Sequence, residues 1–449
     1  MGENSTALTA DVTVIVPVRD CAPYLVQCLD SILGQTLPPR QVVCVDDGSV
    51  DGSSAILDRF ARENACVEVL HLDGVGPGAA RNRGFERATG AYTLFVDADD
   101  FIEPCLLELA CKQADERESD IVAWDIWFFN DRFGHRQYPS EGTFCFGKLD
   151  NGSVFSWKNN PDWLFLSFQS WAWNKLFRTS FLRNEGIRFQ ESVTRSEDVP
   201  FTCMALAAAK RISCIYDRLS NYRVARAGSA MATKDAHALE FFDAFLCLRE
   251  ELEKRNLYDA LRRGFANFAF SSCLYNLQTV KSQEAMEKVY RFLKDEGFKK
   301  LGIDGNEEEL WLNDGWREEW NRITDMNFGA YAFYRMQVLA NALDDATAVG
   351  DHVAMDLRAE IDERDATIAS KDRELEERDE VIRLRDTAIE ELNGVIADRD
   401  RTIAEKEAFI QEILGCAEWK VGSALCAAPR AVQRKILAAK EEKKGSREA

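Results

Sequence analysis

Apolar runs and amphipathic segments alternate through the first 130 residues, and this alternation limits the fold more than any other feature of the chain. Five apolar runs are typical of buried strands, at 12–18, 41–47, 67–72, 91–97 and 120–129. Segments with helical spacing lie between them, at 24–35, 53–63 and 79–88, with a further helix after Pro104. Continuous apolar strands joined by helices predict an α/β fold, with a Rossmann-like, mostly parallel sheet covered on both faces.

Composition changes along the rest of the chain, so that five parts are expected within the 449 residues. Residues 150–230 are rich in aromatic side chains, and helical apolar spacing then extends to about residue 345. The expected parts are a disordered N-terminus (1–10), the α/β domain (11–230), a helical accessory region (231–346), a long charged helix (347–415) and a basic amphipathic tail (416–449).

A seven-residue repeat runs through the charged helix, with an apolar residue at every seventh position from Ile361 to Ile410. The companion positions are mostly basic–acidic pairs such as Arg364-Asp365 and Arg378-Asp379. A coiled coil requires two apolar positions in each heptad, and this stretch mostly supplies one. The repeat therefore predicts a long charged helix, and it leaves open whether the helix is solitary or forms a weak homo-oligomeric coiled coil.

Charge and cysteine usage restrict the partners and the compartment. The net charge of −20 argues against a nucleic-acid partner. The 13 cysteines are scattered and form no CxxC pair, as expected for buried apolar side chains in a reducing cytoplasm. No signal peptide and no transmembrane segment are expected. The tail at 416–449 resembles a basic interfacial helix, which would place a cytoplasmic protein peripherally at the inner face of the membrane; packing on its own chain is the alternative.

Acidic side chains follow two of the expected strands. Asp97, Asp99 and Asp100 end the run at 94–96, and Asp46-Asp47 end the run at 41–45. Two unit charges about 4 Å apart at a protein surface repel by roughly 4 kcal/mol. Asp100 alone would serve to cap the next helix, but a cap requires one carboxylate and this stretch has three. In a parallel sheet both groups lie at the edge where ligands bind.

An arginine-bearing, glycine-rich segment at 74–84 lies between these two acidic groups in the sequence. Taken alone it could be an ordinary loop and helix start, with Arg81 and Arg83 in solvent. Together with the acidic edge, it favours a nucleotide diphosphate held through a divalent cation. Mg²⁺ or Mn²⁺ bound by one or two carboxylates completes its coordination with phosphate oxygens, and the cation would offset the carboxylate repulsion.

Four segments, in this order and spacing, resemble family 2 glycosyltransferases of the GT-A fold: "VTVIVPVRDCAPYLVQCLDSILGQTL", "VVCVDDGSVDGS", "GPGAARNRG" and "LFVDADDFIEP". The resemblance covers about residues 10–230. It implies inverting transfer of a sugar from a nucleotide-diphosphate donor, a UDP-sugar by family habit, with Mn²⁺ or Mg²⁺ as cofactor. It also implies a glycan or lipid-linked acceptor and a role in bacterial cell-surface polysaccharide biosynthesis.

The resemblance assigns the donor site to positions that match the family motifs. Pro17, Asp46 and Asp47 would lie at the nucleoside, and Arg81 would approach the base or the diphosphate. Asp97 and Asp99 form the DxD motif: Asp97 would lie near the ribose and the metal, and Asp99 would bind the metal. Arg223 offers a diphosphate clamp, as does Arg226, although an arginine in a loop is usually solvated.

The segment "RSEDVPF" at 195–201 matches the family's downstream acidic motif, with Asp198 as the general base and Glu197 as its neighbour. Inversion requires one carboxylate that takes the proton of the acceptor hydroxyl. The alternative is an acidic cap on a helix that starts at Val199-Pro200. Trp171, Trp173 and Asn174 could line the acceptor pocket, and core packing is an equally good interpretation of these three.

A different class of function stays open beside the enzyme. The chain could be a non-catalytic glycosyltransferase-like scaffold that acts through its coiled coil. A degenerate family member would be expected to lose Asp99 or Asp198, and this sequence keeps both. A nucleotidyltransferase would require a glycine- and lysine-rich loop after the first strand, which "VPVRDCAPYL" does not supply.

Overall fold

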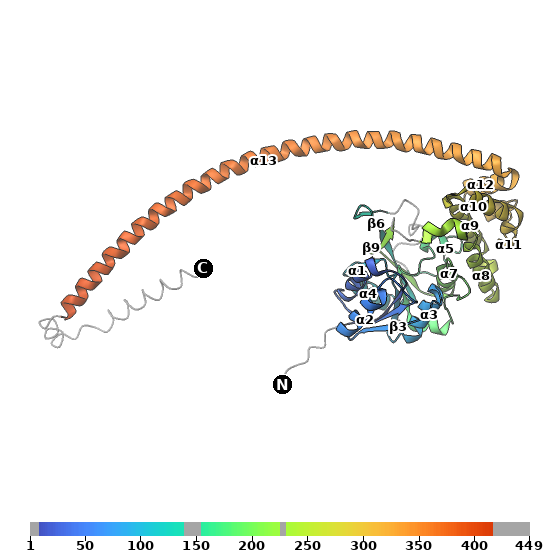
Figure 1. The fold of residues 1–449 in the computed structure, drawn as a ribbon, viewed down its shortest axis with the longest axis horizontal. Helices are drawn as coiled ribbons and strands as arrows, with labels where there is room; N and C mark the ends of the chain where they lie inside the picture. The colour runs from blue at the N-terminus through green and yellow to red at the C-terminus, as the bar shows by residue number, and fades with distance from the viewer. Residues whose placement is uncertain (1–8, 139–153, 225–229, 416–449) are drawn as a thin grey trace. The chain divides into compact units, whose positions relative to one another are not determined.

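The structure is a computed structural model that describes residues 9–138, 154–224 and 230–415. It divides into two compact units, Met1–Met336 and Gln337–Ala449 (Figure 1), and each is described by itself. The expected disordered segment falls almost entirely outside the described residues, and the amphipathic tail at 416–449 falls wholly outside them.

A nine-stranded sheet forms the centre of the first unit, with the order β3-β2-β1-β4-β8-β6-β9-β5 and with β7 paired to β6. The strands are β1 Ala10–Val18, β2 Pro39–Asp46, β3 Val67–His71, β4 Tyr92–Phe95, β5 Phe101–Ile102, β6 Ile121–Asn130, β7 His135–Gln137, β8 Lys175–Arg178 and β9 Ile212–Val224. The expected α/β class is confirmed. The sheet is mixed rather than mostly parallel, because β8 runs antiparallel to both of its neighbours, β4 and β6.

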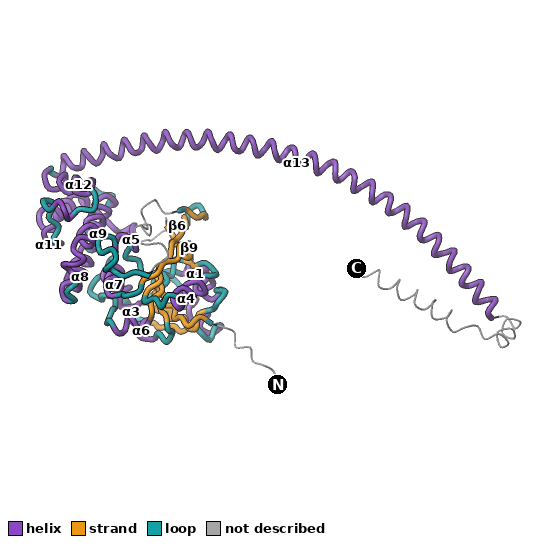
Figure 2. Tube along the Cα trace, turned by 180° about the vertical axis from the view of Figure 1, so that it is seen from behind, coloured by secondary structure: helices purple, strands orange, loops and turns teal. Residues whose placement is uncertain are grey.

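Helices cover both faces of this sheet (Figure 2). Alternate residues of β1 point to opposite faces, so Val14 and Val16 lie in one core and Ile15 in another. The first core is closed by α1 Ala22–Leu33, α2 Ser53–Glu63 and α4 Leu106–Glu116. On the other face lie α3 Pro77–Arg87, α5 Leu164–Phe168, α6 Thr179–Asn184 and α7 Asp198–Ala208.

Gly84 explains how closely α3 approaches the sheet. A Cβ atom at this position would lie 2.5 Å from the Ile15 Cγ2 atom of β1 and 3.2 Å from the Val45 Cγ2 atom of β2. Only glycine fits without displacing one of these side chains. The close packing fixes the start of α3, which carries Arg81, against the strands that end in the acidic groups.

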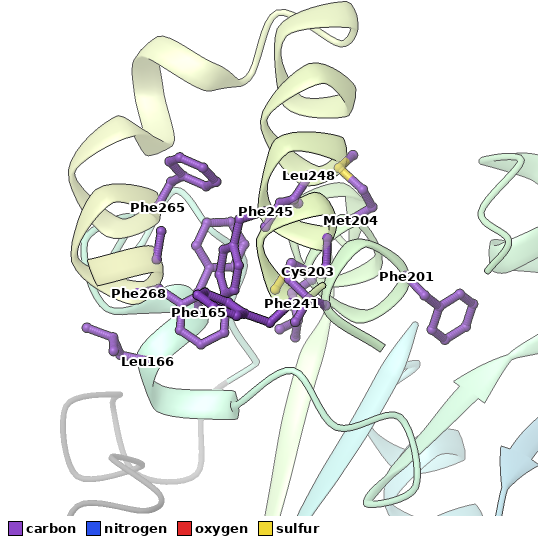
Figure 3. Packing of buried hydrophobic residues seen from close by; sticks show 14 of the residues in the cluster. Phe165, Leu166, Phe201, Cys203, Met204, Phe241, Phe245, Leu248, Phe265 and Phe268 are labelled. Carbon is purple, nitrogen blue, oxygen red and sulfur yellow. The ribbon is translucent and has the colours of Figure 1, made fainter. Parts of the chain in front are cut away.

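A helical region follows the sheet and shares its second core. It contains α8 Phe241–Lys254, α9 Tyr258–Thr279, α10 Gln283–Phe292, α11 Phe298–Leu301 and α12 Asp314–Asp325, with short 3₁₀ or π segments at Ala230–His237, Leu293–Gly297 and Glu308–Leu310. Figure 3 shows Phe201 and Cys203 of α7 in one cluster with Phe241 and Phe245 of α8. Helix α7 is therefore held between the sheet and the helical region.

The last helix, α13 Phe328–Gly415, begins in the first unit and continues into the second. Tyr331 in its first turn is fully buried and donates a 2.8 Å hydrogen bond to the Glu319 carboxylate of α12. In the second unit, the side chains that the structure describes on this helix are exposed, apart from the half-buried Val338 near its start. Among the described residues, no helix has an apolar stretch long enough to cross a membrane.

Cysteine placement agrees with the expectation from the sequence. The ten cysteines within the described residues form no disulfide, and six of them are buried. Burial raises the pKa of the Cys44 thiol to about 12, so this side chain behaves as a small apolar group at neutral pH.

Candidate active site

The acidic groups lie at one edge of the sheet because β2 and β4 both pair in parallel with β1. The end of β1 therefore lies between Asp46 and Asp97. Pro17 pairs in register with Val45 and is partly buried at this edge. Asp46 and Asp97 therefore lie at or just beyond the ends of β2 and β4 at the same edge of the sheet, as expected, with β1 between the two strands.

Asp46 is buried in a network of hydrogen bonds. Its carboxylate accepts from the Ser49 backbone N–H at 3.0 Å and from the Ser54 hydroxyl at 2.5 Å, and it lies 2.9 Å from His71 Nδ1. Burial acts to raise the pKa of Asp46, but these hydrogen bonds outweigh it, so the pKa is lowered and the carboxylate stays ionised.

The sequence did not reveal the contact of His71 with Asp46, since His71 lies 25 positions further along the chain, at the end of β3. Its Nε2 atom lies 3.2 Å from the Asp58 carboxylate, so the ring bridges two acidic side chains. The hydrogen bond to Asp46 raises the pKa of His71.

Asp47 shapes the loop that leads into α3. Its carboxylate accepts from the backbone N–H groups of Val75 at 2.6 Å and Gly76 at 2.9 Å. Gly74 and Gly76 have φ values of +77° and +95°, a region that favours glycine. Arg19 approaches the same carboxylate at 3.6 Å. In this structure Asp47 therefore sets the path of the main chain toward Arg81.

Arg81 connects the turn after β4 with the residue that precedes α7. Its guanidinium donates to the Asp97 carboxylate at 2.7 Å and to the Glu197 carboxylate at 2.6 Å. The side chain is only 7% exposed, and Phe189 covers it at 5.3 Å. Burial acts to lower the pKa of Arg81, but Asp97, Asp198 and Glu197 outweigh it and raise the pKa, so the guanidinium stays charged.

Asp99 and Asp100 occupy the turn after β4. Asp100 is buried; one carboxylate oxygen accepts the Arg223 backbone N–H at 2.7 Å, and the other has no hydrogen-bond partner. Burial, followed by the charges of Asp99 and Asp97, raises the pKa of Asp100. Helix α4 begins at Leu106 without a side-chain cap. Capping therefore does not account for Asp100.

Arg223 holds this turn in place by hydrogen bonds. Its Nε donates to the Asp99 carbonyl at 2.7 Å, and its two terminal nitrogens donate to Asp131 and to Gln27 at 2.6 Å each. The ring of Tyr24 lies 4.8 Å from the guanidinium. Every nitrogen of the guanidinium is engaged within the protein. This geometry is at odds with the expected diphosphate clamp, and it makes Arg223 a support for Asp99. Arg226 lies outside the described residues.

Asp198 is the first residue of α7 and lies next to the Arg81 network. Its Oδ1 atom is buried and has no hydrogen-bond partner. Burial, opposed by Arg81 and reinforced by Glu197 and Asp97, raises the pKa of Asp198 to about 7. Helix α7 has no side-chain hydrogen bond at its N-terminus. The capping alternative for Glu197-Asp198 therefore has no support, because Glu197 pairs with Arg81 instead.

Lys175, which the sequence did not single out, organises the aromatic segment beside the site. It is fully buried, and its Nζ donates to the carbonyls of Phe168 at 2.9 Å and Trp171 at 2.7 Å, and to Asn174 Oδ1 at 2.8 Å. Burial lowers the pKa of Lys175 to about 7. A lysine with three carbonyl acceptors ties the chain between α5 and β8 into one conformation.

The expected acceptor residues differ in their accessibility. Asn174 is fully buried and donates to the Trp124 carbonyl at 3.0 Å, a position at odds with direct contact to an acceptor. Trp171 is partly buried and Trp173 is buried; their rings stack at 5.0 Å, and Trp173 stacks on Tyr222 at 5.2 Å. Burial, followed by the charges of Asp100, Asp97 and Asp99, raises the pKa of the Tyr222 hydroxyl, so this end of the stack lies near the acidic turn.

The residues at this edge fit a hard divalent cation. Within the described ranges, no group of three or more His, Cys, Asp or Glu side chains converges in ligand geometry. Asp97 and Asp99 nevertheless supply carboxylate oxygens from one turn, and Mg²⁺ or Mn²⁺ held by two carboxylates completes its shell with substrate phosphate and water. The donor set is therefore compatible with a cation that arrives together with a nucleotide diphosphate.

Comparison with known proteins identifies the family. The model of glycosyl transferase family 2 matches residues 13–185. Glycosyltransferase GlyG of Streptococcus pneumoniae is 31% identical over 230 residues, which are 50% of this chain and 73% of GlyG. Poly(ribitol-phosphate) beta-glucosyltransferase of Bacillus spizizenii is 30% identical over 292 residues, covering 63% of this chain and 44% of that protein. The chain belongs to glycosyl transferase family 2, a family of transferase enzymes.

A solved structure extends the similarity to the fold. Residues 1–349 of Staphylococcus aureus TarS, in complex with UDP-GlcNAc, superpose with a TM-score of 0.56 at 23% identity. The match covers 73% of this chain and 92% of that one, and it confirms the GT-A fold. The chain spans less than two thirds of the length of several curated relatives, 60% of one from Bacillus subtilis and 44% of the Bacillus spizizenii enzyme.

Replacement of Arg81 by methionine should destabilise the protein by about 3–5 kcal/mol, because it leaves Asp97 and Glu197 at the edge of the core without their cation. Arg83→Met is the matched control, since the Arg83 side chain is 43% exposed on the same helix; it should change stability by no more than about 0.5 kcal/mol. Urea unfolding of the three proteins measures the difference, and equal stability of the two variants would contradict the proposed importance of the bridge.

Proposed function

We propose that this protein is an inverting glycosyltransferase that moves a sugar from a nucleotide-diphosphate donor to a hydroxyl group of a glycan or lipid-linked acceptor. The observation that carries the proposal is the environment of the Asp198 carboxylate. The Oδ1 atom of Asp198 is buried without a hydrogen-bond partner, an arrangement that destabilises the folded protein. The Asp198 carboxyl has a pKa of about 7, which suits a general base at neutral pH. It lies beside the acidic edge where the donor would bind.

The donor site is assigned to residues at the ends of β1, β2 and β4. Pro17, Asp46 and Asp47 would face the nucleoside, with His71 holding the Asp46 carboxylate in place. Asp97 and Asp99 would hold Mn²⁺ or Mg²⁺, which would neutralise the charge that develops on the departing diphosphate. A UDP-sugar is the first donor to test, because the structurally similar TarS was solved with UDP-GlcNAc.

Within the chain, each charged residue has a separate part in the transfer. Asp198 would take the proton of the acceptor hydroxyl on the face opposite the diphosphate, which gives inversion. Arg81, held by Asp97 and Glu197, would keep positive charge at the edge where the donor phosphates arrive. Trp171 and Trp173 offer aromatic faces on which an acceptor sugar could stack. Two relatives are named for transfer to poly(ribitol-phosphate), which supports a polymer with free hydroxyl groups as the acceptor class.

Nucleotide binding tests the donor site directly. Calorimetry with UDP, GDP, TDP and CDP, each with and without Mn²⁺, should show metal-dependent binding of one diphosphate. Asp99→Ala should weaken that binding by about tenfold or more, because a metal ligand is lost. Asp73→Ala, which removes an exposed carboxylate near the same edge, should bind as the wild type does. If the wild type binds no nucleotide under any condition, the non-catalytic scaffold replaces the enzyme.

Asp198→Asn should leave nucleotide binding intact and lower the rate of transfer by about 10²–10⁴, because the amide cannot accept the proton. In the wild type, kcat/KM should rise with pH through about 7, since Asp198 acts only when its carboxyl is ionised. The same substitution should raise thermal stability at pH 8, where burial makes the ionised carboxylate unfavourable. A variant that transfers sugar at the wild-type rate would exclude Asp198 as the base.

A peripheral association with the inner face of the membrane is part of the proposal and is supported by sequence alone, since residues 416–449 lie outside those that the structure describes. Removal of these residues should release the protein from anionic vesicles in a flotation experiment, while UDP binding stays unchanged. Unaltered flotation of the truncated protein would show that membrane contact, if present, is made elsewhere.

A further inference from the structure

The second unit carries an apolar stripe that the proposed transfer reaction does not use. Within the described part of α13 it consists of the residues at one heptad position: Ile368, Leu375, Ile382, Ile389, Ile396 and Ile403. Their side chains are between 44% and 55% exposed. A strict seven-residue spacing keeps them on one side of the helix if it supercoils gently. Exposed isoleucine at such regular spacing indicates a surface that another helix covers.

A row of basic residues lies three positions after each residue of the stripe: Lys371, Arg378, Arg385, Leu392, Arg399 and Lys406, with Leu392 as its one apolar member. The structure gives the basic members no ion pair within the described residues. Arg383 and Arg401, which lie on another side of the helix, do pair with Glu380 and Asp398 at 3.3 and 3.2 Å. The basic row therefore has charge that the helix itself does not match.

Sequence explains why three members of the row, Arg385, Arg399 and Lys406, are unmatched. Glu374 lies within three or four positions of Lys371 and Arg378, but the structure gives it no ion pair with either among the described residues. Ion pairs along a helix join residues three or four apart. The residues at these distances from Arg385 are Val381, Ile382, Ala388 and Ile389, and none of them carries a charge. The acidic row instead follows the basic row by one position, at Asp372, Asp379, Asp386, Asn393, Asp400 and Glu407, and adjacent residues on a helix do not face each other.

We propose that α13 pairs with α13 of a second copy of this chain in a parallel, in-register, two-stranded coiled coil. The residues of the apolar stripe occupy one core position of the heptad, a, and the residues of the basic row occupy the other, d. The long stems of arginine and lysine cover apolar surface while their charged ends reach the edge of the interface. There each basic end meets the acidic residue at position e of the partner helix. The pairing does not depend on the proposed transfer reaction.

Packing geometry supports this assignment. A side chain at d of a parallel pair inserts into a hole on the facing helix that includes the partner's residues at d and e. The Arg385 guanidinium of one copy is thereby brought to the Asp386 carboxylate of the other, and the reciprocal pair forms by symmetry. Layers of paired isoleucine alternate with layers of two basic and two acidic side chains.

The antiparallel arrangement is disfavoured by the same residues. Reversing one helix places each a residue opposite a d residue, so isoleucine would face arginine in successive layers. It also brings the e positions of the two helices together, which places Asp386 and its equivalents near one another. Like charges along an interface are unfavourable, whereas the parallel arrangement gives each carboxylate a cation.

One heptad breaks the pattern and fixes the register. Leu392 occupies the basic row and Asn393 the acidic row. In register, Leu392 packs against Leu392 of the partner and both asparagines stay at the edge. A slip of one heptad would place each leucine against Arg385 or Arg399 and would leave acidic residues without partners. A single irregular layer can specify alignment in this way.

Two apolar residues of one heptad provide a matched test in the full-length protein. Ile382 lies in the stripe and is 52% exposed; Leu384 lies off the stripe and is 64% exposed. Light scattering on a size-exclusion column should give about twice the 50.8 kDa chain mass for the wild type and for Leu384→Asp. Ile382→Asp should shift the protein toward the monomer and raise the dimer Kd at least tenfold. A monomeric wild type, a trimer, or equal effects of both variants would overturn the proposal.

A charge exchange tests the arginine–aspartate layers. Arg378→Asp with Arg385→Asp should weaken the dimer, because position d then repels position e of the partner. Adding Asp379→Arg and Asp386→Arg should restore it. The control instead adds Glu377→Arg and Glu391→Arg to the weakened protein. These two substitutions change the net charge by as much as Asp379→Arg and Asp386→Arg do, but on the outer side of the helix. Restoration by the control as well would show that net charge alone is responsible, and would refute the layers.

Cross-linking distinguishes the direction and the register. Leu392→Cys should form an intermolecular disulfide above the wild-type background on mild oxidation, because only the parallel, in-register pair brings the two sulfur atoms together. Leu384→Cys, equally exposed on the outer side, should stay at the background level. A dimer in which Leu392→Cys does not cross-link would contradict the parallel, in-register arrangement.

Discussion

The paired contact of Arg81 with Asp97 and Glu197 is the interaction on which the site depends. Asp97 follows β4, Glu197 precedes α7, and the arginine on α3 joins them across the edge of the sheet. Three carboxylates lie close to this single buried cation, counting Asp198, and their repulsion would otherwise separate the strand end from the helix. Gly84 sets the distance, since it lets α3 lie directly on β1 and β2.

The helical region acts on the same site through packing. Helix α7 lies in a core that extends from Phe95 of the sheet to Phe245 of α8, so the start of α7 cannot move without disturbing both. Asp198 lies at the start of this helix with one buried carboxylate oxygen that has no hydrogen-bond partner, and burial raises its pKa. The aromatic core thus holds in place the helix on which Asp198 lies, which gives residues 231–346 a structural connection to the proposed chemistry.

Sequence predicted the parts of the site that depend on strand ends. Asp46, Asp97 and Asp99 lie where parallel strands must end, and periodicity located those strands. The strands β8 and β9 were not identified, because they lie in an aromatic-rich stretch where no alternation separates core from loop. Arg223 and Asn174 were assigned to ligands, yet their donors are taken up by the protein, a fact that only tertiary contacts reveal. His71 and Lys175 carried no local signal for the same reason.

Asp47 holds its loop through main-chain N–H groups, and this leaves the side chains of the loop free to change. The Val75 side chain is 47% exposed and takes no part in the contact that Asp47 makes with its backbone. Its size and polarity can therefore change without loosening the loop or moving α3. A position beside the proposed donor site whose shape is fixed by its backbone, and whose side chain is free to vary, is one where new selectivity can evolve at little risk to folding.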